Sequence, residues 1–83
     1  MSKNRQTVEI FGQQYSIIGN ASPGHMRNVA NQVDEFMRKV AKGNPRLDMT
    51  RVAVLSAVNF ADSYTRLKQE YDEIIHLIED VEP

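Results

Sequence analysis

"VEIFGQQYSIIG", residues 8–19, alternates apolar and polar side chains on either side of a glycine. This pattern is typical of a β-hairpin, in which a tight turn joins two strands. We expect Gly12 and Gln13 to form a two-residue type II′ turn that places Ile10 opposite Tyr15. One face of the hairpin then carries the apolar side chains of Val8, Ile10, Tyr15 and Ile17. Because an isolated two-stranded hairpin is only marginally stable in water, this face must pack on another element.

The residues that follow the hairpin, about 22–42, are predicted to form an amphipathic helix. Ser22 is a favoured N-cap, and Pro23 suits the first helical position. Gly43, followed closely by Pro45, marks the end. Apolar side chains recur at helical spacing along one face, namely Met26, Val29, Ala30, Val33, Phe36, Met37 and Val40. We expect this face to pack on the apolar face of the hairpin.

A second, longer helix is predicted after Asp48, the expected N-cap, since neither Pro nor Gly interrupts the chain before Pro83. A helix of about 34 residues is roughly 50 Å long, more than a domain of this size can enclose, so part of it must project. Its first half, "RVAVLSAVNFA" at 51–61, has apolar residues on nearly every side and is expected to be buried all round. Asn59 within it is expected to be a buried, hydrogen-bonded amide. We also expect the apolar face of the hairpin to cover this half of the helix, in its own chain or partly in a partner subunit.

The second half of this helix carries apolar residues alternately four and three positions apart, which are the a and d positions of a heptad repeat. With two flanking residues that widen the stripe, the predicted oligomer seam comprises Phe60, Tyr64, Leu67, Tyr71, Ile74, Ile75, Leu77, Ile78 and Val81. The wide stripe and the large tyrosines at a positions favour an antiparallel or four-helix arrangement. The alternative is a two-stranded coil that leaves Ile75 and Leu77 exposed.

The whole chain of 83 residues is predicted to be one α+β unit that forms homo-oligomers. We expect a head over residues 1–46, with the hairpin at about 6–19 and the first helix at about 22–42, then a loop at 43–47. The long helix follows over 47–83. A chain this short buries a modest fraction of its surface, and it has no Cys to form a disulfide. Oligomerisation is therefore the expected source of additional stability.

The charge is distributed unevenly along the chain. Residues 1–68 contain ten Lys and Arg against five Asp and Glu, a net charge of +5, whereas residues 69–83 contain six acidic residues and no basic one. A basic head favours an acidic partner through electrostatic steering. No nucleic-acid-binding motif accompanies these charges, so nucleic acid is not an expected partner. The chain also lacks the long apolar run of a membrane span and the apolar core of a secretory signal, which predicts a cytosolic protein.

No pattern typical of catalysis or of metal binding is found. His25 and His76 have no second ligand at metal-binding spacing, and the four glycines match no phosphate-binding loop. The Ser and Thr residues match no nucleophile motif. The sequence therefore predicts a protein that is not an enzyme and that requires no cofactor or metal.

Two stretches, taken together, resemble the ZapA family of bacterial cell-division proteins, most closely its Bacillus-type members. They are "TVEIFGQQYSIIG" at 7–19 and "NPRLDMTRVAVLSAVN" at 44–59, followed by a charged coiled-coil helix. The resemblance implies a cytoplasmic protein of the mid-cell division site that binds FtsZ, the tubulin-like GTPase of the division ring, and bundles its protofilaments. It also implies a homodimer that pairs into a homotetramer through antiparallel coiled coils.

In ZapA-like proteins the contact with FtsZ is attributed to the charged surface of the head. Carried onto this sequence, the resemblance implies Arg46 as the first candidate, followed by Arg51, Lys42, Arg38 and Arg27. Ordinary solvated surface charge is the alternative explanation for each of them. The alternative function is a generic coiled-coil adaptor or small regulator whose basic head binds another acidic partner.

Overall fold

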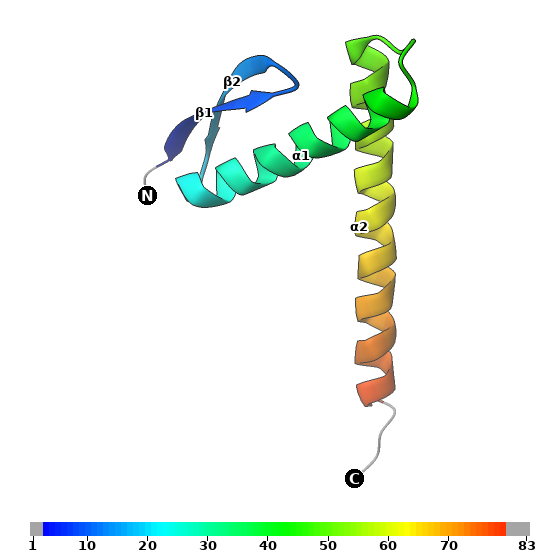
Figure 1. Ribbon diagram of the computed structural model, residues 1–83. Helices are drawn as coiled ribbons and strands as arrows, with labels where there is room; N and C mark the ends of the chain where they lie inside the picture. The colour runs from blue at the N-terminus through cyan, green and yellow to red at the C-terminus, as the bar shows by residue number, and fades with distance from the viewer. Residues whose placement is uncertain (1–2, 80–83) are drawn as a thin grey trace.

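The computed structural model describes residues 3–79, and the side chains of residues 3–76. Two strands, β1 (Asn4–Ile10) and β2 (Gln13–Gly19), precede two helices, α1 (Pro23–Gly43) and α2 (Met49–Glu79). In Figure 1 the hairpin lies along α1, and α2 crosses the far end of α1 and extends well beyond it. The molecule is flat and elongated, measuring 55 × 40 × 14 Å. The fold is α+β, as the sequence predicts.

The hairpin forms where it is expected, but its turn lies one residue earlier. The strands pair with Ile10 opposite Gln13 and Val8 opposite Tyr15, so the loop residues are Phe11 and Gly12. Both have positive φ, 53° and 79°, which is the type I′ conformation. The predicted pairing of Ile10 with Tyr15 and the predicted type II′ turn are therefore wrong. The observed pairing is displaced by two positions from the predicted one. Because side chains alternate between the two faces of a strand, a displacement of two keeps the four predicted apolar residues on one face.

That face of the hairpin packs on α1 of the same chain. Val8 in β1 and Met26 and Ala30 in α1 are all at least 94% buried, and the Asn4 side-chain amide donates to the Ala21 carbonyl at 2.9 Å. Of the two strands, it is chiefly β1 that contacts α1. We expected the hairpin also to cover the first half of α2. Within one chain this is wrong, because α2 packs at the other end of α1 (Figure 1).

The helix boundaries follow the predicted capping residues. The Ser22 hydroxyl accepts the His25 N–H at 3.2 Å at the start of α1, and the Asn44 N–H donates to the Ala41 carbonyl beyond its end. The Asp48 carboxylate accepts the Arg51 N–H at 2.9 Å at the start of α2. Each bond satisfies a backbone group that has no partner inside the helix.

Only one face of the first half of α2 is covered by the same chain. Val52 and Ser56 are buried, and the Phe60 ring lies 5.2 Å from the Phe36 ring of α1. The opposite side is exposed at Val54, Leu55 and Val58. The expectation that this half is buried all round is therefore not met within one chain, because residues 3–79 provide no further element to cover it.

After Phe60, every side chain that the structure describes, as far as His76, is exposed. This confirms that part of α2 projects from the rest of the molecule. Asn59 is hydrogen-bonded as expected, with its amide donating to the Leu55 carbonyl at 2.9 Å, but it is exposed rather than buried. Neither helix contains, within the described residues, an apolar stretch long enough to cross a membrane.

Candidate partner-binding surfaces

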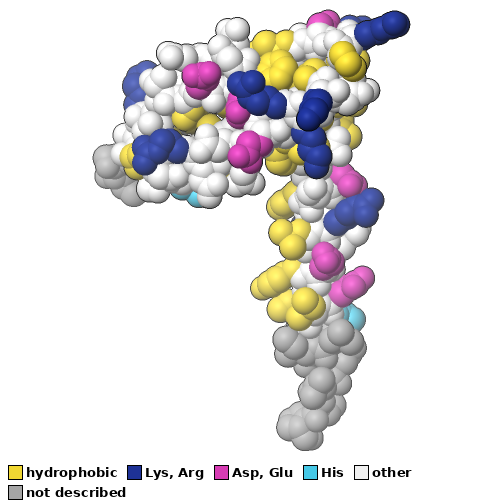
Figure 2. All heavy atoms as spheres, in the orientation of Figure 1, with side chains coloured by type: hydrophobic (Ala, Val, Ile, Leu, Met, Phe, Trp, Pro, Cys, Tyr) yellow, Lys and Arg dark blue, Asp and Glu magenta, His cyan; other side chains and the backbone are white. Residues whose placement is uncertain are grey.

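The five basic residues predicted to bind a partner are all exposed, but they do not form one patch. Arg27 lies near the start of α1 and Lys42 in its last turn, roughly 22 Å apart at the rise of a helix. Arg46 lies in the loop between the helices, and Arg51 in the first turn of α2. The fold therefore brings Lys42, Arg46 and Arg51 to the end where the helices meet. In Figure 2, dark blue side chains lie along α1 and at this end.

Two of these cations pair with carboxylates of their own helix or its cap. Arg38 Nε is 3.0 Å from Asp34 Oδ2, and Arg51 Nη1 is 3.2 Å from Asp48 Oδ2. The Arg38 and Arg51 side chains remain 56% and 72% exposed, so water screens both pairs and each contributes little to stability. The other three of the five candidates, Arg27, Lys42 and Arg46, have no carboxylate at ion-pair distance within residues 3–76.

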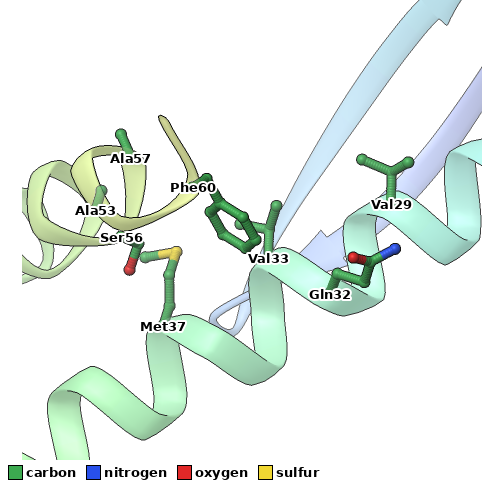
Figure 3. A pocket seen from close by; sticks show the side chains of 8 residues that line it. All are labelled: Val29, Gln32, Val33, Met37, Ala53, Ser56, Ala57 and Phe60. Carbon is green, nitrogen blue, oxygen red and sulfur yellow. The ribbon is translucent and has the colours of Figure 1, made fainter. Parts of the chain in front are cut away.

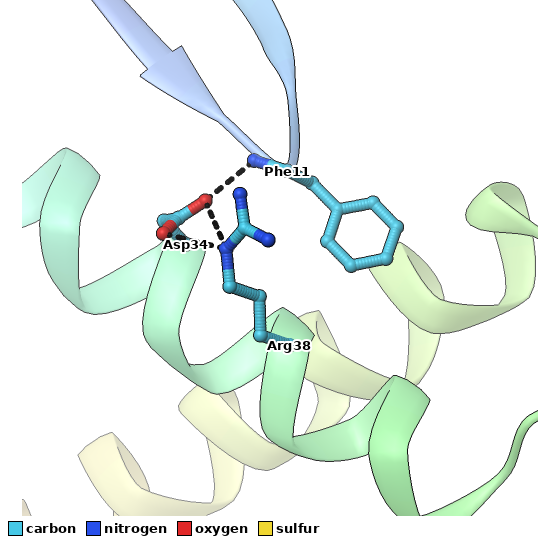
Figure 4. A network of polar contacts seen from close by, with 3 residues as sticks. All are labelled: Phe11, Asp34 and Arg38. Atoms are coloured by element: carbon cyan, nitrogen blue, oxygen red, sulfur yellow. Dashed lines mark hydrogen bonds and ion pairs between the residues drawn. The ribbon is translucent and has the colours of Figure 1, made fainter.

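Asp34 connects α1 to the hairpin turn, as Figure 4 shows. Its Oδ1 accepts the Phe11 N–H at 2.7 Å, and Arg38 Nε donates to its two oxygens at 3.2 and 3.0 Å. The Arg38 guanidinium carbon lies 5.9 Å from the centre of the Phe11 ring, within cation–π range. The bonds from Arg38 and from the Phe11 N–H hold the pKa of Asp34 below its usual range. We call these three residues the hairpin latch.

The sequence predicts only one member of the hairpin latch, Arg38, as a candidate site residue. The spacing of four between Asp34 and Arg38 is typical of an ion pair on a helix and could have indicated that part. The bond between Asp34 and Phe11 joins residues 23 positions apart, and no local pattern predicts it. This tertiary bond joins the turn at Phe11 and Gly12 to α1.

An apolar groove of about 430 Å³ opens where α1 and α2 cross (Figure 3). We call it the elbow groove. Its lining residues are Val29, Gln32, Val33 and Met37 of α1 and Ala53, Ser56, Ala57 and Phe60 of α2. Ala53, Ala57 and Phe60 continue the a and d spacing of the predicted seam toward the start of α2. The elbow groove therefore lies in line with the seam.

The part of the predicted seam that the structure describes is strongly exposed beyond Phe60. Tyr64, Leu67 and Tyr71 are 67%, 66% and 62% exposed, and Ile74 is 56% exposed. Hydrophobic side chains form a band along one side of the projecting part of α2 in Figure 2. The side chains of Leu77 and Ile78, and all of Val81, lie outside the described part. A single chain thus leaves an extended apolar stripe uncovered.

The described residues contain no group of three His, Cys, Asp or Glu side chains placed to hold a metal ion. His25 and His76 are both exposed, on different helices. The chemical features of this surface are therefore cations, an apolar groove and an apolar stripe, all of which suit contacts with other macromolecules.

Comparison with known proteins gives consistent matches. A family model described as "Cell division protein ZapA" matches residues 7–82. A protein of that name from Geobacillus sp. (strain WCH70) is 48% identical over 73 residues, which are 88% of this chain and 84% of the relative. Another from Bacillus pumilus is 47% identical over 87% of this chain and 85% of the relative. A solved structure described as a ZapA mutant dimer from Geobacillus stearothermophilus has a TM-score of 0.80 at 40% identity, covering 96% of this chain and 93% of its own.

Proposed function

The chain belongs to the ZapA family of cell division proteins, and from this we propose that it binds FtsZ and crosslinks its protofilaments as a homo-oligomer. We further propose that it acts in the cytoplasm at the mid-cell division site, without catalysis. The observation that carries the proposal is the exposed apolar stripe on the projecting part of α2, in a molecule whose basic end lies where the two helices meet. A crosslinker needs these two features, a means of self-association and a surface for the filament.

Self-association is supported by how much apolar surface a single chain leaves uncovered. Tyr64, Leu67, Tyr71 and Ile74 are each more than half exposed at a and d positions, where a coiled coil buries its side chains against another helix. We propose a homodimer, and we propose that two dimers pair into a tetramer through antiparallel coiled coils that cover this stripe. The proposed seam extends to Leu77, Ile78 and Val81.

The long α2 also suits the role of a spacer. We propose that the chain divides into a head, made of residues 1–46 with the part of α2 that packs on α1, and a projecting arm. Assembly through the arms would hold two or more heads apart. Linking two heads makes the second filament contact intramolecular, so weak individual contacts give strong bundling.

The filament-binding residues are proposed at the basic end of the head. Arg46 is the first candidate, because it is exposed in the loop and has no ion-pair partner within residues 3–76. Its neighbours Lys42 and Arg51 add positive charge at the same end. Arg38 and Arg27, along α1, complete the proposed set.

The test is co-sedimentation with polymerised FtsZ at low and physiological salt. We expect wild-type protein to pellet with the polymers and Arg46→Gln to pellet severalfold less, since it loses one charge at the contact. Arg66→Gln, an equal loss of charge on the projecting part of α2, is the matched control and should pellet like wild type. The absence of wild-type protein from the polymer pellet at both salt concentrations would contradict the proposed function.

A further inference from the structure

The hairpin latch and the adjacent Lys42 form a surface of unusual composition, with a planar cation, an aromatic ring and a second cation side by side on the head. Building on the proposed function, we propose that Phe11, Arg38 and Lys42 form one docking surface for a carboxylate-bearing face of the filament subunit. Asp34 is its positioning residue, since it fixes both the Arg38 guanidinium and the turn that carries Phe11.

Arg38 has further N–H donors that can form hydrogen bonds with a partner. A guanidinium carries five N–H donors, and in the described residues only Nε–H of Arg38 is used, for Asp34. The two terminal nitrogens can therefore form the paired hydrogen bonds that suit a carboxylate. The side chain is 56% exposed, which leaves this end accessible. Because Asp34 holds Nε, the guanidinium is already oriented before a partner arrives, and less side-chain entropy is lost on binding.

Phe11 occupies a conformation that a bulky residue rarely adopts. Its φ of 53° lies in the left-handed region, where Gly, Asn and Asp are the usual residues. Phe11 is partly exposed, so part of this strained residue faces the solvent. Strain of this kind is concentrated at functional sites, where the surrounding structure holds it in place. Here the 2.7 Å bond from the Phe11 N–H to Asp34 provides that support.

The position of Lys42 extends the positive charge along the same face of α1. It lies one turn beyond Arg38, at a spacing of four, and is exposed. Arg27 is on this face too, three turns before Arg38. An acidic face of the partner is the complement of this row of cations, and the Phe11 ring adds apolar contact at its edge.

The projecting part of α2 offers a matched comparison. Arg66 Nε pairs with Asp62 Oδ2 at 2.9 Å, at the same spacing of four, and its side chain too is more than half exposed. This pair lies beyond the part of α2 that packs on α1. A variant of Arg66 therefore repeats the local change made at Arg38 without touching the proposed docking surface.

The first test compares Arg38→Lys with Arg66→Lys in co-sedimentation with polymerised FtsZ. Lysine keeps the positive charge. Its single ammonium group cannot bind Asp34 and also donate two parallel hydrogen bonds to a carboxylate of the partner. We expect Arg38→Lys to weaken the apparent affinity about tenfold, the effect of one lost charge-assisted contact, and Arg66→Lys to leave it unchanged.

The second test is Phe11→Asn, because asparagine tolerates positive φ and should preserve the turn. We expect an unchanged or higher melting temperature together with a weaker affinity for the polymers. A purely structural role for Phe11 predicts unchanged affinity.

The outcomes separate this inference from the proposed function. Wild-type protein that fails to bind the polymers defeats the proposed function and the inference that rests on it. Wild-type binding with equal affinity in Arg38→Lys or in Phe11→Asn overturns the docking surface and leaves the proposed function intact. Weaker binding in both variants, with Arg66→Lys like wild type, supports the inference.

Discussion

The two residues of the hairpin turn, Phe11 and Gly12, both have backbone angles in the left-handed region, but the conformational free energy that this costs differs between them. Glycine adopts a φ of 79° without strain, whereas phenylalanine at 53° costs about 1–2 kcal/mol. The charge-assisted bond from the Phe11 N–H to Asp34 offsets part of that cost. The turn therefore depends on one glycine and one carboxylate.

Gly12→Ala tests the conformational requirement at the turn. No atom lies within 4 Å of a Cβ built there, so any effect must come from the positive φ. We expect a loss of about 1 kcal/mol in the free energy of unfolding. Gly24→Ala is the control, because a Cβ there also meets open space and Gly24 lies inside α1. It should be neutral or stabilising. Urea unfolding at a fixed protein concentration measures both, and equal effects would contradict this explanation of the turn.

Asp34→Asn tests the contribution of the hairpin latch as a function of pH. The pKa of Asp34 is lowered in the folded state, so the carboxylate stabilises the fold above its unfolded pKa of about 3.9. This stabilisation is lost as the pH falls through the lower, folded pKa. We expect the unfolding free energies of wild type and variant to differ by a constant amount from about pH 7 to 5, and to converge below about pH 4. A difference that disappears between pH 7 and 5 would argue against this role.

At the scale of the elements, the sequence predicts those structural features that depend on residues close together in the chain. The caps at Ser22 and Asp48 and the apolar face of α1 follow from local spacing, and all three are present. The hairpin register does not follow, because the contact that selects it comes from Asp34, 23 positions beyond Phe11. Propensity alone disfavours phenylalanine at positive φ, which is why the turn is misplaced by one residue.

The candidate partner-binding surfaces are likewise predictable from the sequence only in part. Heptad spacing predicts the seam, and its backward continuation through Ala57 and Ala53 points toward the elbow groove. Composition and the family resemblance predict the basic candidates, and the helix predicted over about 22–42 already places Arg27 and Lys42 at its opposite ends. The exposed patch of Val54, Leu55 and Val58 could not be predicted from one chain, since apolar periodicity indicates burial without identifying what covers it.

The cap of α1 gives a test at this scale. Ser22→Ala removes the hydroxyl that accepts the His25 N–H, and we expect a loss of about 1 kcal/mol in the free energy of unfolding. Thr65→Ala is the control, because Thr65 is exposed at an outward heptad position within the projecting part of α2. There alanine should be neutral or slightly stabilising. Thermal unfolding of both variants, compared at one concentration, measures the difference, and an unaffected Ser22→Ala would show that the cap is unimportant.

At the scale of the whole molecule, the L-shaped arrangement places the two kinds of surface in different regions. The basic end lies where the helices meet, and the apolar stripe runs along the arm (Figure 2). Binding to a filament and association with another copy therefore use different residues. A change in the arm is expected to alter valency while leaving each head's contact with the filament intact.

Light scattering of polymerised FtsZ with wild-type protein, Ile74→Glu and Gln69→Glu tests the central claim of crosslinking most directly. Ile74→Glu puts a charge into the seam, where it would lose hydration without a partner, whereas Gln69→Glu adds the same charge at an outward heptad position. We predict that wild type and Gln69→Glu bundle the filaments, and that Ile74→Glu, reduced to a dimer, still binds filaments without bundling them. Bundling by Ile74→Glu at the assembly mass of wild type would contradict the account.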